Sequence, residues 1–97
     1  MEEVRLSVEN ISNSLRELAG WHFDPSNNTI EKSYTRKNFV DAVSFIQAIV
    51  PIAEKNDHHP DILLSDYKKV TIMLSTHSAG GVTQKDFELA REIDKLQ

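Results

Sequence analysis

The sequence contains no cysteine among its 97 residues, which excludes disulfide bonds, thiolate nucleophiles and cysteine-ligated zinc. Long apolar runs are also missing, since the longest covers only residues 48–53 and includes Pro51. A helix that crosses a bilayer needs about 20 apolar residues, so we expect no membrane segment. The acidic start, M-E-E-V-R, lacks the basic and then apolar pattern of a signal peptide. These absences predict a cytoplasmic protein.

Positive charge is scarce as well. Lysine and arginine number 11 against 15 aspartates and glutamates, and the net charge is −4. A nucleic-acid-binding surface needs a dense basic patch, whereas this chain offers only the pairs Arg36-Lys37 and Lys68-Lys69. We therefore expect no direct binding of nucleic acid. The length predicts one domain, residues 1–97, small enough that pairing with other copies would help it to bury apolar surface.

Three segments carry apolar residues at helical spacing. The first covers residues 6–18. The second, residues 38–54, is the longest, and its apolar stripe is wide enough to cover a sheet and to contact another subunit. Pro51 should kink this helix or end it early, because proline removes a backbone donor. The third helix follows Thr83, which forms a capping-box-like pattern with Asp86 three residues later.

Strand patterns fill the gaps between these helices. Residues 21–23 and 29–35 are aromatic and β-branched, and they flank the turn formers D-P-S-N-N, which predicts a β-hairpin. Residues 62–64 form a short apolar run, and residues 69–75 alternate with a period of two. The resulting order predicts an α+β fold, a four-stranded antiparallel sheet with three helices packed on one face.

Three of the four histidines lie in the two most polar, turn-prone stretches. His58 and His59 lie in N-D-H-H-P-D before one predicted strand, and His77 lies in L-S-T-H-S-A-G-G after the next. A hairpin between the two strands would bring these stretches side by side. Pro60 forces an extended conformation on His59, so the adjacent imidazoles should point to different sides.

Histidine exchanges protons near neutral pH, with an unperturbed pKa of about 6.5. Three imidazoles in one pocket suit acid–base catalysis without a metal or a covalent nucleophile, and Glu54 and Asp57 could orient them. The residues alone leave two other interpretations open. The histidine pair could be an ordinary exposed turn, or three imidazoles could hold zinc. We predict no metal, because adjacent histidines rarely both reach one ion.

A series of short motifs extends from residue 53 to residue 90. It comprises Ala53-Glu54-Lys55, Asp57-His58-His59-Pro60-Asp61, Tyr67, Lys69-Val70, Leu74-Ser75-Thr76-His77, Gly80-Gly81, Thr83, Asp86 and Leu89-Ala90. Together these motifs resemble the pterin-4a-carbinolamine dehydratase family, and the similarity runs from about residue 15 to residue 96. H-H-P alone would be a weak signal, but H-H-P followed by T-H, G-G and a threonine-capped helix is specific.

The resemblance implies the same α+β fold. It also implies that the chain removes water from 4a-hydroxytetrahydrobiopterin to give quinonoid dihydropterin, which recycles the cofactor of aromatic amino-acid hydroxylases. The substrate would be a pterin, no added cofactor would be required, and the chain would form a homodimer or homotetramer. The family also suggests alternatives: a non-catalytic dimerisation partner of a transcription factor, or a role in molybdopterin metabolism.

The family's functional residues carry over by position. The implied catalytic residues are His58, His59 and His77, the substrate-binding residues are Asp57, Ser75, Thr76, Ser78 and Trp21, and the supporting carboxylates are Glu54 and Asp86. Within the trio, His58 and His77 are expected as acid and base, with His59 positioning the pterin. Two departures bear on subunit pairing more than on chemistry: one additional residue between Pro60 and Val70, and Pro51 within the long helix.

Overall fold

The computed structural model describes residues 4–96. The elements are α1 (Val8–Leu15), β1 (His22–Asp24), β2 (Thr29–Thr35), α2 (Phe39–Asn56), β3 (Asp61–Ser65), β4 (Lys69–Leu74), the 3-10 turn η1 (His77–Ala79) and α3 (Gln84–Asp94). This order confirms the predicted α+β fold and adds the short turn η1. No helix in this part of the chain is both long and apolar enough to cross a membrane.

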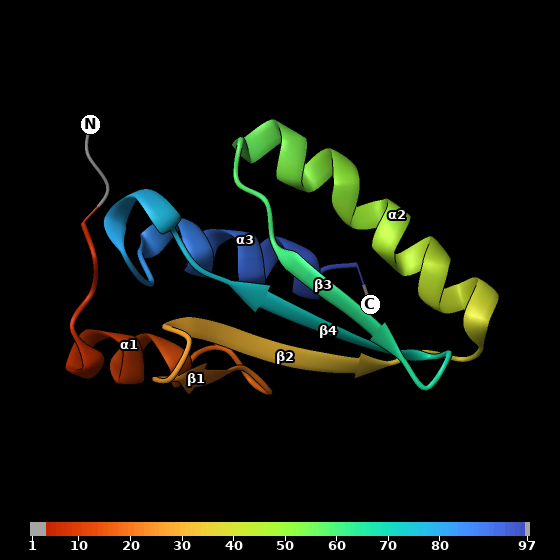
Figure 1. Ribbon diagram of the computed structural model, residues 1–97, viewed down its shortest axis with the longest axis horizontal. Helices are drawn as coiled ribbons and strands as arrows, with labels where there is room; N and C mark the ends of the chain where they lie inside the picture. The colour runs from red at the N-terminus through yellow and green to blue at the C-terminus, as the bar shows by residue number, and fades with distance from the viewer. Residues whose placement is uncertain (1–3, 97) are drawn as a thin grey trace.

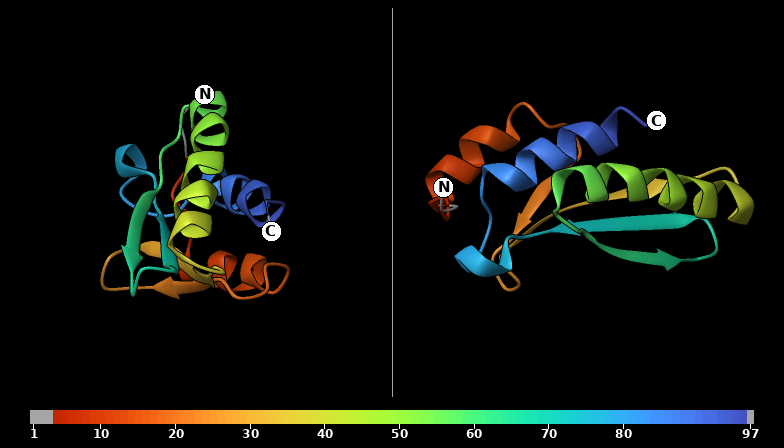
Figure 2. Two further views of the ribbon diagram at one scale, coloured as in Figure 1. Left: turned by 90° about the vertical axis from the view of Figure 1, so that its right-hand side faces the viewer. Right: turned by 90° about the horizontal axis from the view of Figure 1, so that it is seen from above.

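The four strands form one antiparallel sheet in the order β1-β2-β4-β3 (Figure 1). All three helices lie on the same side of the sheet (Figure 2). Alternation along β4 explains this layering, because Val70, Ile72 and Leu74 are buried under the helices while Thr71 and Met73 point to the other face. None of the helices among residues 4–96 covers that other face (Figure 2).

Helix α1 is shorter than predicted at both ends. Ser7 caps its start, with its side chain accepting from the Asn10 N–H at 3.1 Å. Leu6 stays outside the helix because its N–H donates to the Val82 carbonyl at 2.8 Å. After Leu15 the backbone bonds connect residues three apart, as in a 3-10 helix, so the last predicted turn is tighter than an α-helix.

Helix α2 continues through Pro51 to Asn56, so the prediction of an early end is wrong. Pro51 is exposed, and a helix can relax toward solvent where a proline interrupts its ladder. The helix ends at Asp57, which adopts the left-handed conformation with φ 47°. The N–H groups of Asp57 and His58 bond back to carbonyls of the last turn at 3.2 and 3.1 Å, which sets where the histidine loop begins.

The face of α2 that packs on the sheet lies within the predicted wide apolar stripe. The buried residues are Ala42, Phe45, Ile49 and Ala53. The other members of that stripe are exposed or half-buried, namely Phe39, Val43, Ile46, Val50 and Ile52. Since Val50 is 55 % exposed, an apolar strip on α2 remains uncovered within one chain.

The hairpin between β3 and β4 turns through Asp66, Tyr67 and Lys68. Asp66 and Tyr67 both have positive φ angles, 50° and 54°. The flanking register from Asp61↔Met73 to Ser65↔Lys69 is regular. We therefore infer that the turn, rather than the paired strands, absorbs the additional residue noted between Pro60 and Val70.

Candidate active site

Two loops that are distant in sequence meet at one end of the sheet. One follows α2 and contains residues 57–60, and the other follows β4 and contains residues 75–81. They meet because β3 and β4 are antiparallel, with Asp61 paired to Met73. The cavity between them has a volume of about 270 Å³ and is lined by Asp57, His58, His59, Ser75, Thr76, His77, Ser78 and Lys85.

His58 is tied to a buried carboxylate. Its Nε2 lies 2.5 Å from Oδ1 of Asp86, and its side chain is only 10 % exposed, while that of Asp86 is fully buried. The other carboxylate oxygen, Oδ2, accepts from the Thr83 N–H at 2.9 Å and from the Thr76 hydroxyl at 3.0 Å. Asp86 therefore completes the capping box of α3 and holds His58 with the same side chain.

The hydrogen bonds around Asp86 fix the direction of each donor. The hydroxyls of Thr76 and Thr83 lie 2.8 Å apart, and each hydroxyl has one proton to donate. Because Thr76 donates to Asp86, Thr83 must donate to Thr76. A carboxylate can only accept hydrogen bonds, so we assign the proton that faces Oδ1 of Asp86 to Nε2 of His58. The nitrogen left for a substrate is Nδ1.

His59 makes a different contact, as its extended backbone predicted. Its Nε2 lies 2.6 Å from Oε2 of Glu54, and both side chains are exposed, at 59 % and 67 %. An exposed pair of this kind contributes about 0–1 kcal/mol to stability. The pair positions the ring at the rim of the cavity, and it also borders an apolar groove of about 160 Å³ along α2.

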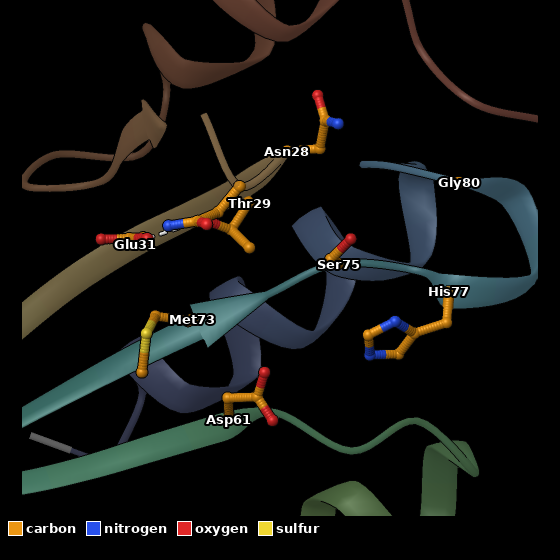
Figure 3. A pocket seen from close by; sticks show the side chains of 9 residues that line it. Asn28, Thr29, Glu31, Asp61, Met73, Ser75, His77 and Gly80 are labelled. Atoms are coloured by element: carbon orange, nitrogen blue, oxygen red, sulfur yellow. Dashed lines mark hydrogen bonds between the residues drawn. The ribbon is translucent and has the colours of Figure 1, made fainter. Parts of the chain in front are cut away.

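His77 begins the turn η1 in the second loop. This loop is closed at its base, where Thr76 and Gly81 exchange backbone bonds of 2.9 and 3.3 Å, and Gly80 adopts a left-handed conformation with φ 75°. His77 is exposed at the tip and lines the cavity. Figure 3 shows its imidazole reaching from the loop toward Ser75 and Asp61.

One predicted site residue lies elsewhere. Trp21 is buried on the helix side of the sheet, where its Nε1 donates to Oδ2 of Asp94 at 3.1 Å and its ring meets Tyr34 edge-on. It does not line the cavity of this chain. Conversely, Lys85 lines the cavity and was not predicted. Its position two residues after the Thr83 cap was the available signal, because that position lies in the first turn of α3, beside Asp86.

Among residues 4–96 no group of three or more histidine, aspartate or glutamate side chains is placed to hold a metal ion. His58 and His59 each direct Nε2 at a separate carboxylate rather than at a common point. The geometry of these residues therefore gives no support to the alternative of a three-imidazole zinc site.

Comparison with known proteins agrees with this geometry. Residues 4–96 match the model of a family described as pterin 4 alpha carbinolamine dehydratase. The chain belongs to this family. Two relatives provisionally named pterin-4-alpha-carbinolamine dehydratase are 46 % and 45 % identical. The one from Sulfolobus acidocaldarius aligns over 97 % of this chain and all of its own length, and the one from a Picosynechococcus strain over 95 % and 97 %.

Two solved structures extend the comparison. A protein from Brucella melitensis, described as a transcriptional coactivator/pterin dehydratase, superimposes with a TM-score of 0.88 at 35 % identity, covering 95 % of this chain and 97 % of its own. A pterin dehydratase-like protein described as a RuBisCO assembly factor in the alpha-carboxysome superimposes with a TM-score of 0.67 at 19 % identity, covering 81 % and 90 %. The second similarity shows the fold alone.

Proposed function

We propose that this chain removes water from a 4a-hydroxytetrahydropterin, such as 4a-hydroxytetrahydrobiopterin, to give the quinonoid dihydropterin. The observation that carries the proposal is the shared cavity, in which His58, held by buried Asp86, and His77 come from opposite loops. Membership of the dehydratase family supports it. The product would be reduced elsewhere, so the reaction would recycle the cofactor of aromatic amino-acid hydroxylases.

The chemistry needs two proton transfers and no electron transfer. The C4a–O bond breaks, the departing oxygen takes up a proton and leaves as water, and the neighbouring ring nitrogen loses its proton as a C=N bond forms. One group must therefore donate and another must accept. Imidazoles suit both tasks near neutral pH, and positioned acid–base groups contribute about 10²–10⁴ in rate.

The roles follow from how each imidazole is held. His58 is fixed by Asp86 through Nε2, which leaves Nδ1 unprotonated as the base that takes the proton from the ring nitrogen. His77, exposed at the loop tip, is the acid that protonates the departing hydroxyl, so the proposed order of acid and base is the reverse of the one expected from the resemblance. His59 is held by Glu54 and positions the pterin. Asp57, Ser75, Thr76 and Ser78 line the same cavity and contact the substrate.

Substitution of the two proton-handling histidines tests the proposal. We expect His58→Ala and His77→Ala each to lose at least about 100-fold in kcat, because each removes one acid–base partner. The measurement follows the loss of a freshly generated 4a-hydroxypterin in the ultraviolet. His22→Ala is the matched control, since His22 is an exposed histidine outside the cavity. Wild-type rates in both test variants would overturn the mechanism.

A binding role is the second candidate function. The Brucella relative is described as a coactivator as well as a dehydratase, and this chain leaves apolar residues uncovered on α2 and β3, namely Phe39, Val40, Val50 and Leu63. We infer that the strip on α2 pairs copies of the chain into a homodimer or homotetramer. A purely structural partner would keep its binding when the histidines are replaced, whereas the dehydratase would lose its turnover.

A further inference from the structure

A second hollow adjoins the candidate active site on the uncovered face of the sheet (Figure 3). Its volume is about 370 Å³, and it is lined by Asn27, Asn28, Thr29, Glu31, Asp61, Met73, Ser75, His77 and Gly80. Ser75 and His77 line this hollow and the histidine cavity alike, so the two spaces meet at these residues. Small-molecule sites commonly have volumes of about 300–1,000 Å³, so one ligand can occupy both spaces.

The register of the sheet sets two carboxylates in this hollow. Glu31 on β2 and Asp61 on β3 both pair with Met73 on β4, so they stand on either side of it in one row. Adjacent strands are about 4.8 Å apart, which places the two backbones about 10 Å from each other. Any group lying over Met73 is therefore close to a carboxylate on each side.

Glu31 is held in this position rather than free to turn away. The Thr29 hydroxyl donates to its Oε2 at 2.7 Å, Thr29 is itself buried, and the Glu31 side chain is only 16 % exposed. The lining contains no lysine or arginine. Asn27, Asn28 and Ser75 add amide and hydroxyl groups to the lining.

We propose that the C6 substituent of the bound pterin extends past His77 into this hollow, and that Glu31 and Asp61 act there as a charge filter. The inference rests on the proposed function. Neutral tails of different structure fit, because the lining offers both donors and acceptors. A tail that ends in phosphate is disfavoured, because it would bring a dianion beside the carboxylates of Glu31 and Asp61, with no lysine or arginine in the lining to offset the repulsion.

The test compares three substrates whose C6 tails are a methyl group, a dihydroxypropyl group and a phosphate-terminated chain. We expect the wild-type kcat/KM values for the two neutral substrates to agree within about fivefold. At low salt, the kcat/KM for the phosphorylated substrate should be lower than these values by about 20-fold or more. In Glu31→Gln/Asp61→Asn the ratio of phosphorylated to neutral kcat/KM should rise by about tenfold. Added salt should bring the wild-type kcat/KM of the phosphorylated substrate closer to that of the neutral substrates, since the screening length is about 10 Å at 0.1 M.

Glu88→Gln is the matched control, because it removes one exposed carboxylate on α3 outside the hollow and should leave the ratio unchanged. A wild-type preference for the phosphorylated tail, or an unchanged ratio in the double variant, would overturn the inference while the dehydratase activity stands. If the wild type turns over none of the substrates, the proposed dehydratase function is refuted, but the inference about the C6 tail can still be tested by binding. The affinities of unreactive oxidised pterins with the same tails are then compared between the wild type and the double variant. If the protein binds none of these pterins, the proposed function and the inference are both refuted.

Discussion

Replacing Asp86 with asparagine tests how the carboxylate controls His58. Asparagine keeps the shape of the side chain but has one acceptor oxygen and one NH2 donor. The oxygen can still accept from Thr83 and Thr76, which preserves the helix cap. The NH2 group then faces Nε2 of His58, so the imidazole must accept there and carry its proton on Nδ1. The tautomer that faces the substrate is therefore inverted.

The structure sets the expected size of both effects. The wrong tautomer removes the acid–base contribution of His58, so kcat should fall by about 10²–10⁴. A hydrogen bond to a charged group contributes about 1.5–3 kcal/mol, and losing the charge at this buried position should cost about 2 kcal/mol. For a domain of this size that lowers Tm by about 10 °C, which leaves the protein folded at 25 °C.

The assay combines turnover, thermal unfolding and the ¹⁵N chemical shifts of the His58 ring, which report the tautomer directly. Asp94→Asn is the control, because Asp94 also accepts from three side chains, Trp21 Nε1, Lys32 Nζ and Tyr34 OH at 3.1, 2.9 and 2.6 Å. It lies outside the histidine cavity, so it should lower Tm and leave kcat intact. A kcat within twofold of wild type for Asp86→Asn, or an equal loss in Asp94→Asn, would refute the reasoning.

Two further predictions concern the core and the α2 surface. Burial and the neighbouring Asp94 raise the pKa of the Tyr34 hydroxyl far above its usual value of about 10, so the folded state keeps that proton and loses stability as pH rises above 10. In a Tyr67→Phe variant, which leaves Tyr34 as the one tyrosine of the sequence, a spectrophotometric titration at 295 nm should show ionisation only as the protein unfolds, and ionisation of Tyr34 near pH 10 in the folded protein would contradict this. On α2, Val50→Asp should lower the mass measured by light scattering to that of one chain while Ser44→Asp, an exposed control on another side of the helix, should not. A monomeric wild type would remove the proposed pairing surface.

Local patterns in the sequence determined the helices, the strands and the cap of the last helix. The capping box of Thr83 and Asp86 depends on residues three apart, and the alternation of β4 depends on residues two apart, so both could be predicted from neighbours along the chain. The meeting of His58 and His77 also followed from local information, because a short hairpin returns the chain to the place where it began. The resemblance to a known family then suggested the chemistry that we propose.

The tertiary structure decided which side chains become neighbours when they are far apart in the sequence and no local pattern relates them. Trp21 lies in the core rather than at the cavity, the apolar strip of α2 through Val50 is left uncovered, and Glu31 reaches the neighbourhood of His77 because β2 pairs with β4. The sequence determined the fold class, the helix caps and the two loops, since each depends on residues close together in the chain. Burial and cross-sheet neighbours depend on how the whole chain packs, and only the assembled sheet and helices could settle them.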